Sequence, residues 1–119
     1  MDAKEYLRKL QEIEVKLINK LSQIEEYDYL AERLQTEPET PAYIEAVNTY
    51  CEYIERQQEI LKTLEGLSFD HYIVLYKHYY EHKLLQDAHK ELNKSYAWIK
   101  NKHKTALAEL QEVLNKRCI

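Results

Sequence analysis

A lysine-rich segment near the end of the chain carries residue types that contact nucleic acids. Between Lys90 and Lys104 there are five lysines and a single acid, Glu91. Lysine binds phosphate, Asn101 can pair with the major-groove edge of adenine, and aromatic rings can touch thymine methyls or stack on bases. A solvated lysine face is the alternative interpretation. We expect DNA contacts from eight residues: Lys90, Lys94, Ser95, Tyr96, Trp98, Lys100, Asn101 and Lys104.

A second pattern with possible chemistry is His78-Tyr79-Tyr80-Glu81-His82, which matches the inverted zinc-protease motif H-x-x-E-H. That motif needs a third, downstream ligand on a supporting scaffold, and only 37 residues follow His82. No glycine-rich phosphate loop or Ser/His/Asp set accompanies it. We therefore expect no enzyme activity, no metal and no cofactor, and interpret the two histidines as solvated or packed on tyrosine.

The elements that position these residues are expected to be helices. The chain has 119 residues with one glycine and two prolines, so it offers few sharp turns and room for one modest core. Strong helix formers such as Leu, Glu, Lys and Ala dominate. The sequence therefore predicts an all-α fold.

Charge is unevenly distributed along the chain. The total is −4, but residues 1–70 hold 8 Lys+Arg against 16 Asp+Glu, which gives −8. Residues 71–119 hold 9 against 5, which gives +4, and contain all five histidines. An acidic half thus precedes a basic half that would attract phosphate.

Two long helices are predicted in the acidic half. Apolar residues recur at steps of three and four from residue 3 to about 35, at Leu10, Ile13, Leu17, Leu21, Ile24, Ala31 and Leu34. After a break at 36–40, Thr40 can cap and Pro41 can open a second helix that runs to Gly66. Its inward positions follow heptad spacing, at Ile44, Val47, Cys51, Ile54 and Leu61.

These two helices are expected to pack along each other, because the first is too long to be covered by a small globular core. They can form a hairpin within one chain, or a coiled coil between two chains. The side chains expected at an oligomer or partner interface are Leu10, Leu17, Leu21, Ile24, Ile44, Val47 and Ile54. Tyrosines on both helices are also typical interface residues.

Three shorter helices are predicted after Gly66, at Phe69 to about Glu81, Leu84–Leu92 and Tyr96 to about Lys116. Ser95 can cap the last one, and the short connection before it has helix-turn-helix spacing. Two domains follow: a helical hairpin over 1–66 and a tri-helical helix-turn-helix unit over 67–119. In the last helix Ile99, Ala106, Leu107, Leu110 and Leu114 point inward, so Lys100 and Lys104 point outward. Trp98 could read the groove or pack in the core.

The residues Ser95-Tyr96-Ala97-Trp98-Ile99, His103 and Ala106-Leu107 belong to the pattern S-Y-x-W-I-x-x-x-H-x-x-A-L-x-x-L, which ends at Leu110. This pattern resembles the C-terminal motif of phage-encoded transcriptional regulators of the ArpU/RinA type. Their C-terminal domain is similar to region 4 of bacterial sigma factors and follows a helical segment that often opens like Ala3-Lys4-Glu5-Tyr6-Leu7-Arg8. The resemblance implies control of phage or mobile-element genes, commonly late genes, by an activator that binds promoter DNA.

The chain departs from that pattern at three places. Ala88-His89 stands where the family has an Ile-Ala pair, the turn has no glycine, and Lys94 replaces an apolar residue. We expect the His89 ring to sit where the two helices of the motif approach closely, and the motif to be tilted or partly degenerate.

The predicted function is a DNA-binding transcription regulator. Its partners would be double-stranded DNA and possible further proteins, namely RNA polymerase, another regulator or a second copy of the chain. The alternative is a protein-binding module, such as an inhibitor or antirepressor, built on the same scaffold. Two distant cysteines, Cys51 and Cys118, the lack of a basic-then-apolar leader and the short apolar runs favour the cytoplasm of a bacterial host and no membrane.

Overall fold

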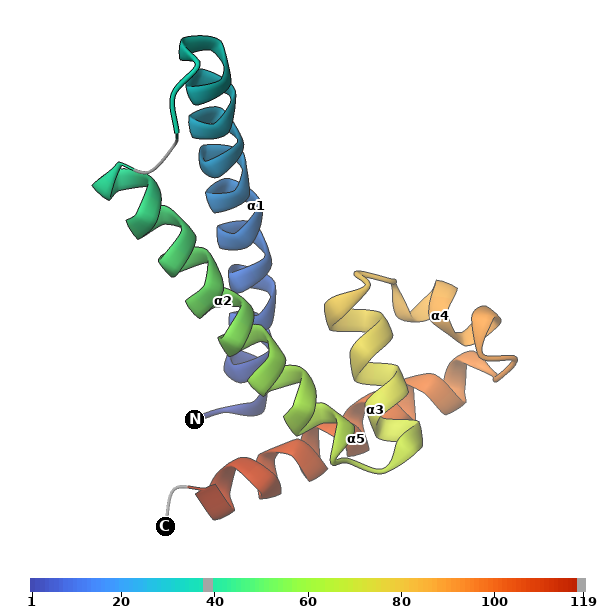
Figure 1. The fold of residues 1–119 in the computed structure, drawn as a ribbon. Helices are drawn as coiled ribbons and strands as arrows, with labels where there is room; N and C mark the ends of the chain where they lie inside the picture. Colours follow the sequence, from blue (N-terminus) through green and yellow to red (C-terminus); the bar gives the residue numbers. More distant parts are fainter. Residues whose placement is uncertain (38–39, 118–119) are drawn as a thin grey trace. The chain divides into compact units, whose positions relative to one another are not determined.

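The computed structural model describes residues 1–37 and 40–117, and within these residues the chain is all-α, without strands. The helices are α1 (Ala3–Leu34), α2 (Pro41–Glu65), α3 (Phe69–Leu75), the π-helical segment η1 (Tyr76–Tyr80), α4 (Leu85–Glu91) and α5 (Tyr96–Arg117) (Figure 1). The predicted fold class is confirmed. Among the described residues, none of the helices combines the length and hydropathy that crossing a membrane would require.

The helix starts and stops follow local side-chain chemistry. Thr40 caps α2, because the Tyr43 N–H donates to its Oγ1 at 3.2 Å, and Ser95 caps α5 in the same way, with the Trp98 N–H at 3.0 Å. At the end of α1, Gln35 takes a left-handed conformation with φ of 54°. Gly66 follows α2 as predicted, yet it does not have a positive φ.

Packing divides the chain into two compact units. One contains residues 1–11 together with the chain from Glu59 onwards, and the other is Glu12–Gln58. The bounds of these two units differ from the predicted division at residue 66. The reason is that the first turns of α1 and the last turns of α2 pack with the C-terminal helices. The functional division into a hairpin and a DNA-binding unit stays a prediction.

The Glu12–Gln58 unit consists of antiparallel segments of α1 and α2. The rings of Tyr27 and Tyr43 meet edge to face with centroids 6.2 Å apart, and the Lys16 ammonium lies 5.8 Å from the Tyr53 ring centroid. The helices thus pair within one chain, which is the hairpin interpretation. Its buried apolar side chains are Ile13, Ile24, Ala31 and Ala46.

Four positions predicted to face inward on these helices are exposed, so those predictions are wrong. Leu21 is 40% exposed, Leu34 71% and Ile44 50%, and Cys51 is exposed with a free thiol; Cys118 lies outside the described residues. On α2 the reason is rotation: Tyr43, Ala46 and Tyr53 face inward or contact α1, which turns the Ile44–Cys51 edge outward.

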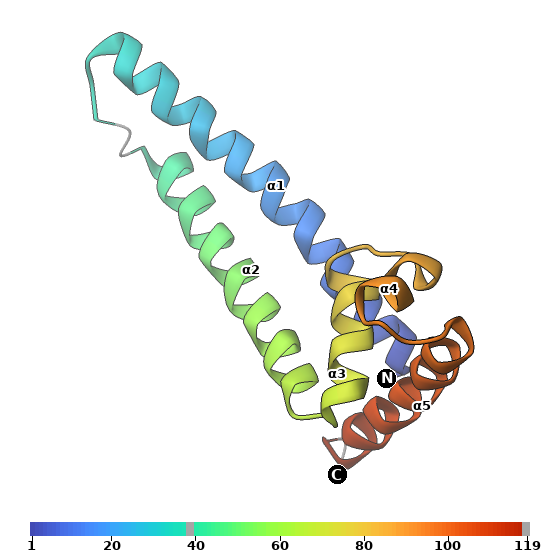
Figure 2. The same cartoon turned by 90° about the vertical axis from the view of Figure 1, so that its right-hand side faces the viewer.

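In the other unit α3 and α4 pack on α5 (Figures 1 and 2). Leu7, Leu10, Leu64, Leu75 and Leu110 are among its fully buried side chains.

The start of α1 is tied into this unit by hydrogen bonds. The Ala3 N–H donates to Gln111 Oε1 at 2.8 Å, and the Tyr6 hydroxyl bonds Thr63 Oγ1 at 3.0 Å. Arg117 donates to the same Thr63 oxygen at 2.8 Å. The ends of both long helices therefore belong to the core that supports α5.

Candidate nucleic-acid interface

The connection between α4 and α5 in the predicted helix-turn-helix is a tight turn, which depends on the backbone of Asn93 and on the side chain of His89. Asn93 has φ of 55°, the left-handed conformation that follows many helices, and asparagine tolerates it better than other residues with a side chain. The His89 Nδ1–H donates to the Lys94 carbonyl at 3.0 Å, while the Lys94 N–H donates to the His89 carbonyl at 3.0 Å. The turn therefore closes without a glycine.

The contact between α3, α4 and α5 is a small apolar cluster. Val74, Ala88 and Ile99 are each fully buried, and the partly buried Ile73, Leu85, Leu92 and Trp98 pack against them. Ala88, with its single methyl group, is thus the fully buried residue that α4 adds to this cluster. The His89 ring is half-buried, bonds the turn and lies with its centroid 5.7 Å from that of the Tyr96 ring at the start of α5. It therefore does lie where α4 and α5 meet, as expected, but beside the fully buried cluster and not in it.

The start of α3 is anchored to α5 by a carboxylate. Glu109 accepts hydrogen bonds from the Ser68 N–H and hydroxyl, both at 3.0 Å, and lies 2.8 Å from His71 Nδ1. The His71 hydrogen bond, followed by those from Ser68, lowers the pKa of Glu109 below its ordinary value. This set of contacts fixes α3 against the helix that carries the lysines.

The first half of α5 has a buried and an exposed face. Ile99 and Ala106 are fully buried, whereas Lys100, Asn101 and Lys104 are exposed. Because the exposed three lie at steps of one and three along the helix, they share one side that is free of packing. Their contact with DNA stays a prediction.

Two aromatic rings flank this exposed side. Trp98 is half-buried against the apolar cluster, and its outer surface lies between Lys94 and Lys102, whose ammonium groups are 5.4 and 5.8 Å from the ring centroid. Tyr96 is 45% exposed, with Lys100 5.3 Å from its ring centroid. Trp98 therefore packs in the core and also holds two cations at the surface.

The lysines of this unit separate into paired and unpaired groups. Lys77 lies 3.0 Å from Glu91 and Lys83 lies 3.3 Å from the same carboxylate, and these hydrogen bonds lower the pKa of Glu91. Lys102 lies 3.9 Å from Asp70. Over the part of the chain that the structure describes, no ion pair within 4.0 Å involves Lys90, Lys94, Lys100 or Lys104. These four predicted contact residues thus carry charge that no carboxylate within 4.0 Å offsets among the described residues.

The H-x-x-E-H motif does not form a regular helical turn. The π-helical segment ends at Tyr80, and His82 has φ of 59°. The His78 Nδ1–H donates to the Lys83 carbonyl at 2.8 Å. Two histidines on successive turns of one α-helix, as the zinc motif requires, are therefore not present.

His78 instead belongs to an aromatic cluster with Tyr79 and His103. The Tyr79 hydroxyl and His103 Nε2 are 3.0 Å apart, the His78 and His103 rings meet edge to face at 5.2 Å, and the Gln11 amide donates to the Tyr79 carbonyl at 3.4 Å. Burial lowers the pKa of His103 below its ordinary 6.5, as do His78 and Lys4 nearby. Burial also raises the pKa of Tyr79.

This cluster predicts lower stability in acid. Since the pKa of His103 is below 6.5 in the folded chain, the unfolded chain binds its proton first as the pH falls. Stability from this residue is constant above pH 6.5 and decreases below it, until the folded form is protonated too. Thermal melts followed by circular dichroism should show a decline in Tm below pH 6.5 that is shallower in His103→Gln. Parallel profiles would contradict this role.

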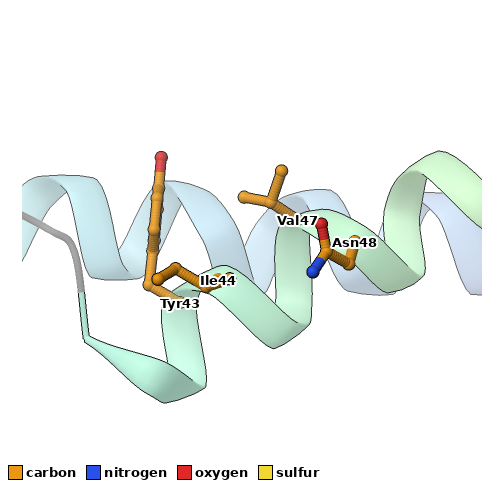
Figure 3. A pocket seen from close by; sticks show the side chains of 4 residues that line it. All are labelled: Tyr43, Ile44, Val47 and Asn48. Atoms are coloured by element: carbon orange, nitrogen blue, oxygen red, sulfur yellow. The ribbon is translucent and has the colours of Figure 1, made fainter.

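The residues of the long helices that were predicted to lie at an oligomer or partner interface differ in burial. Leu10 and Ile24 are buried by their own chain, Leu17, Val47 and Ile54 are half-buried, and Leu21 and Ile44 are exposed. An open hollow of about 400 Å³ lies on the first two turns of α2, lined by Tyr43, Ile44, Val47 and Asn48 (Figure 3). Ile44 and Val47, which line this hollow, and the exposed Leu21 are accessible without opening the hairpin.

Comparisons of the whole chain with known proteins gave no match to any family model, curated protein or solved structure.

Proposed function

We propose that this chain is a transcription regulator of a phage or mobile element that binds promoter DNA through α4, the turn at Asn93 and α5, and that it activates phage genes. The observation that carries the proposal is the exposed side of α5. Lys100, Asn101 and Lys104 lie there together, opposite the buried Ile99 and Ala106. Charged and amide side chains on a helix that follows a short turn are suited to the major groove.

Three further features support the same proposal. Lys90 and Lys94, at the end of α4 and in the turn, are exposed and add positive charge next to the start of α5. The Ser95 cap leaves the N-terminus of α5 at the surface, where its N–H groups and dipole favour a phosphate. The resemblance of Ser95–Leu107 to the tail motif of phage regulators supports the promoter as the target.

Duplex binding should be driven by charge and weaken steeply with salt. If about four to six phosphates are neutralised, log K should fall against log salt with a slope of roughly −4 to −5, at about 0.9 per phosphate. A gel-shift screen of duplexes flanking the gene for this chain, followed by a salt titration of the best one, measures this slope. Absence of binding to any duplex at about 50 mM salt, or a flat titration, would contradict the proposal.

The second candidate function is a protein-binding module, such as an inhibitor or antirepressor. It is favoured by one specific observation: large apolar side chains are exposed along α1, including Val15 and Ile18, each 59% exposed. Apolar surface of this kind is typical of protein contacts and unsuited to phosphate.

A further inference from the structure

The Glu12–Gln58 unit leaves several large apolar side chains of α1 exposed when its two helices pair. Val15 and Ile18 are each 59% exposed, Leu21 is 40% exposed and Tyr29 55%. Together these four side chains are called the outer stripe. Val15, Ile18 and Tyr29 fall at heptad positions, with the exposed Ser22 and Glu25 completing the series. They lie on the opposite side of α1 from the buried Ile13, Ile24 and Ala31, so α1 has a second apolar face.

The charged side chains that border the outer stripe are mainly acidic. Glu12, Glu25, Glu26 and Glu32 are all exposed on this helix. The one cation on the same side, Arg33, is engaged with Tyr29: its guanidinium lies 5.9 Å from the ring centroid and donates to the hydroxyl at 3.3 Å.

The other two cations of α1 within this unit are also engaged in local contacts. Lys16 lies over the Tyr53 ring, and Lys20 donates to Gln23 at 3.0 Å. Residues 12–58 hold 4 Lys+Arg against 11 Asp+Glu, a net charge of −7. The outer stripe is therefore an apolar surface in a strongly negative field.

The combination of apolar surface and negative charge favours some binding partners of the outer stripe over others. A second copy would bring its own −7 unit against this one, and such a pairing is destabilised by repulsion between like charges. DNA and anionic lipid are repelled for the same reason. A basic helix with one apolar face would bury the outer stripe and place its cations against the bordering glutamates.

We propose that the outer stripe of α1 docks a cationic amphipathic helix of a partner protein. From Val15 to Tyr29 the stripe extends about 21 Å, at 1.5 Å per residue, which matches about four turns of a partner helix. Docking follows the helix-on-helix mode, in which apolar side chains of one helix fill the spaces between those of the other. This proposal goes beyond DNA binding and does not depend on it, because it uses none of the α5 lysines.

The test uses the full chain and a synthetic 18-residue helical peptide with leucine at heptad a and d positions and lysine elsewhere. Its binding is measured by fluorescence anisotropy at about 0.15 M salt. A peptide with the same leucines and glutamate in place of lysine is the matched control. We expect the lysine peptide to bind and the glutamate peptide not to bind, since only the first complements the −7 unit.

Two variants separate docking on the stripe from general attraction between opposite charges. Ile18→Ser removes apolar surface without changing charge, and should weaken the lysine peptide about tenfold, as expected for loss of one partly buried aliphatic side chain. Leu34→Ser removes a side chain that is 71% exposed and lies off the stripe, and should leave affinity unchanged. Circular dichroism checks that both variants keep the helicity of the parent.

Three results would overturn the proposal. The first is no binding of the lysine peptide, and the second is equal binding by the parent and Ile18→Ser. The third is a full-length dimer in sedimentation that Ile18→Ser dissociates, because it would make a second copy the occupant. Gel-shift activity of the same variants reports separately on the DNA-binding proposal.

Discussion

Replacing Ile99 by alanine is expected to lower the free energy of unfolding by about 2 to 5 kcal/mol. Ile99 is fully buried in the cluster with Val74 and Ala88, so truncation removes apolar contacts and leaves a cavity that α3 and α4 cannot readily fill. Such a loss is a large share of the roughly 5 to 15 kcal/mol that stabilises a typical domain. Urea denaturation, followed by the circular dichroism signal of helices at about 222 nm, measures the change in the free energy of unfolding.

The matched control is Phe69→Ala in the same compact unit. Phe69 is 76% exposed, so its removal should change stability by no more than about 0.5 kcal/mol. If Ile99→Ala were as mild as this control, Ile99 would not lie at the contact between the helices. A different side of α5 would then be the exposed one, and the outward direction of Lys100 and Lys104 would be wrong.

The extent of the helices could be predicted from the sequence because their signals are local. Apolar steps of three and four, Thr40 and Ser95 as caps, and Pro41 at a first turn act within a few residues. They determine where a helix begins and ends, whichever element packs against it. The predicted bounds accordingly agree with the structure to within a residue or two at most ends.

Which face of a long helix is buried could not be predicted as well. Helix α1 has two apolar faces, one with Ile13 and Ile24 and one with Val15 and Ile18, and spacing alone does not say which of them meets α2. On α2, tyrosines take contacts with α1 that the heptad pattern assigned to smaller aliphatic residues. The exposure of Leu21 and Ile44 follows from these choices of partner, which depend on the tertiary structure.

Two local features of the C-terminal unit were also not predicted from the sequence. The π-helical segment at Tyr76–Tyr80 interrupts a regular helical periodicity. The absence of glycine from the turn was interpreted as a departure from the family pattern, yet Asn93 adopts the left-handed conformation, which asparagine tolerates better than most residues with a side chain. The asparagine between Leu92 and Lys94 was the available signal. The outward direction of Lys100 and Lys104, by contrast, follows directly from burying Ile99 and Ala106 on the opposite side.

Replacing Lys100 and Lys104 together by alanine is expected to weaken duplex binding roughly 60-fold at about 0.1 M salt, since each lost phosphate contact removes about 0.9 from the salt exponent. The slope of log K against log salt should become shallower by about 2. Stability should stay within about 0.5 kcal/mol of the parent, because both side chains are exposed and make no ion pair within the described chain. Lys16→Ala with Lys20→Ala removes the same charge from the acidic unit and should leave the slope unchanged. Gel shifts over a salt series, with thermal melts of each variant, give both quantities. A marked loss of stability with DNA affinity retained would show that α5 presents a different face to its ligand.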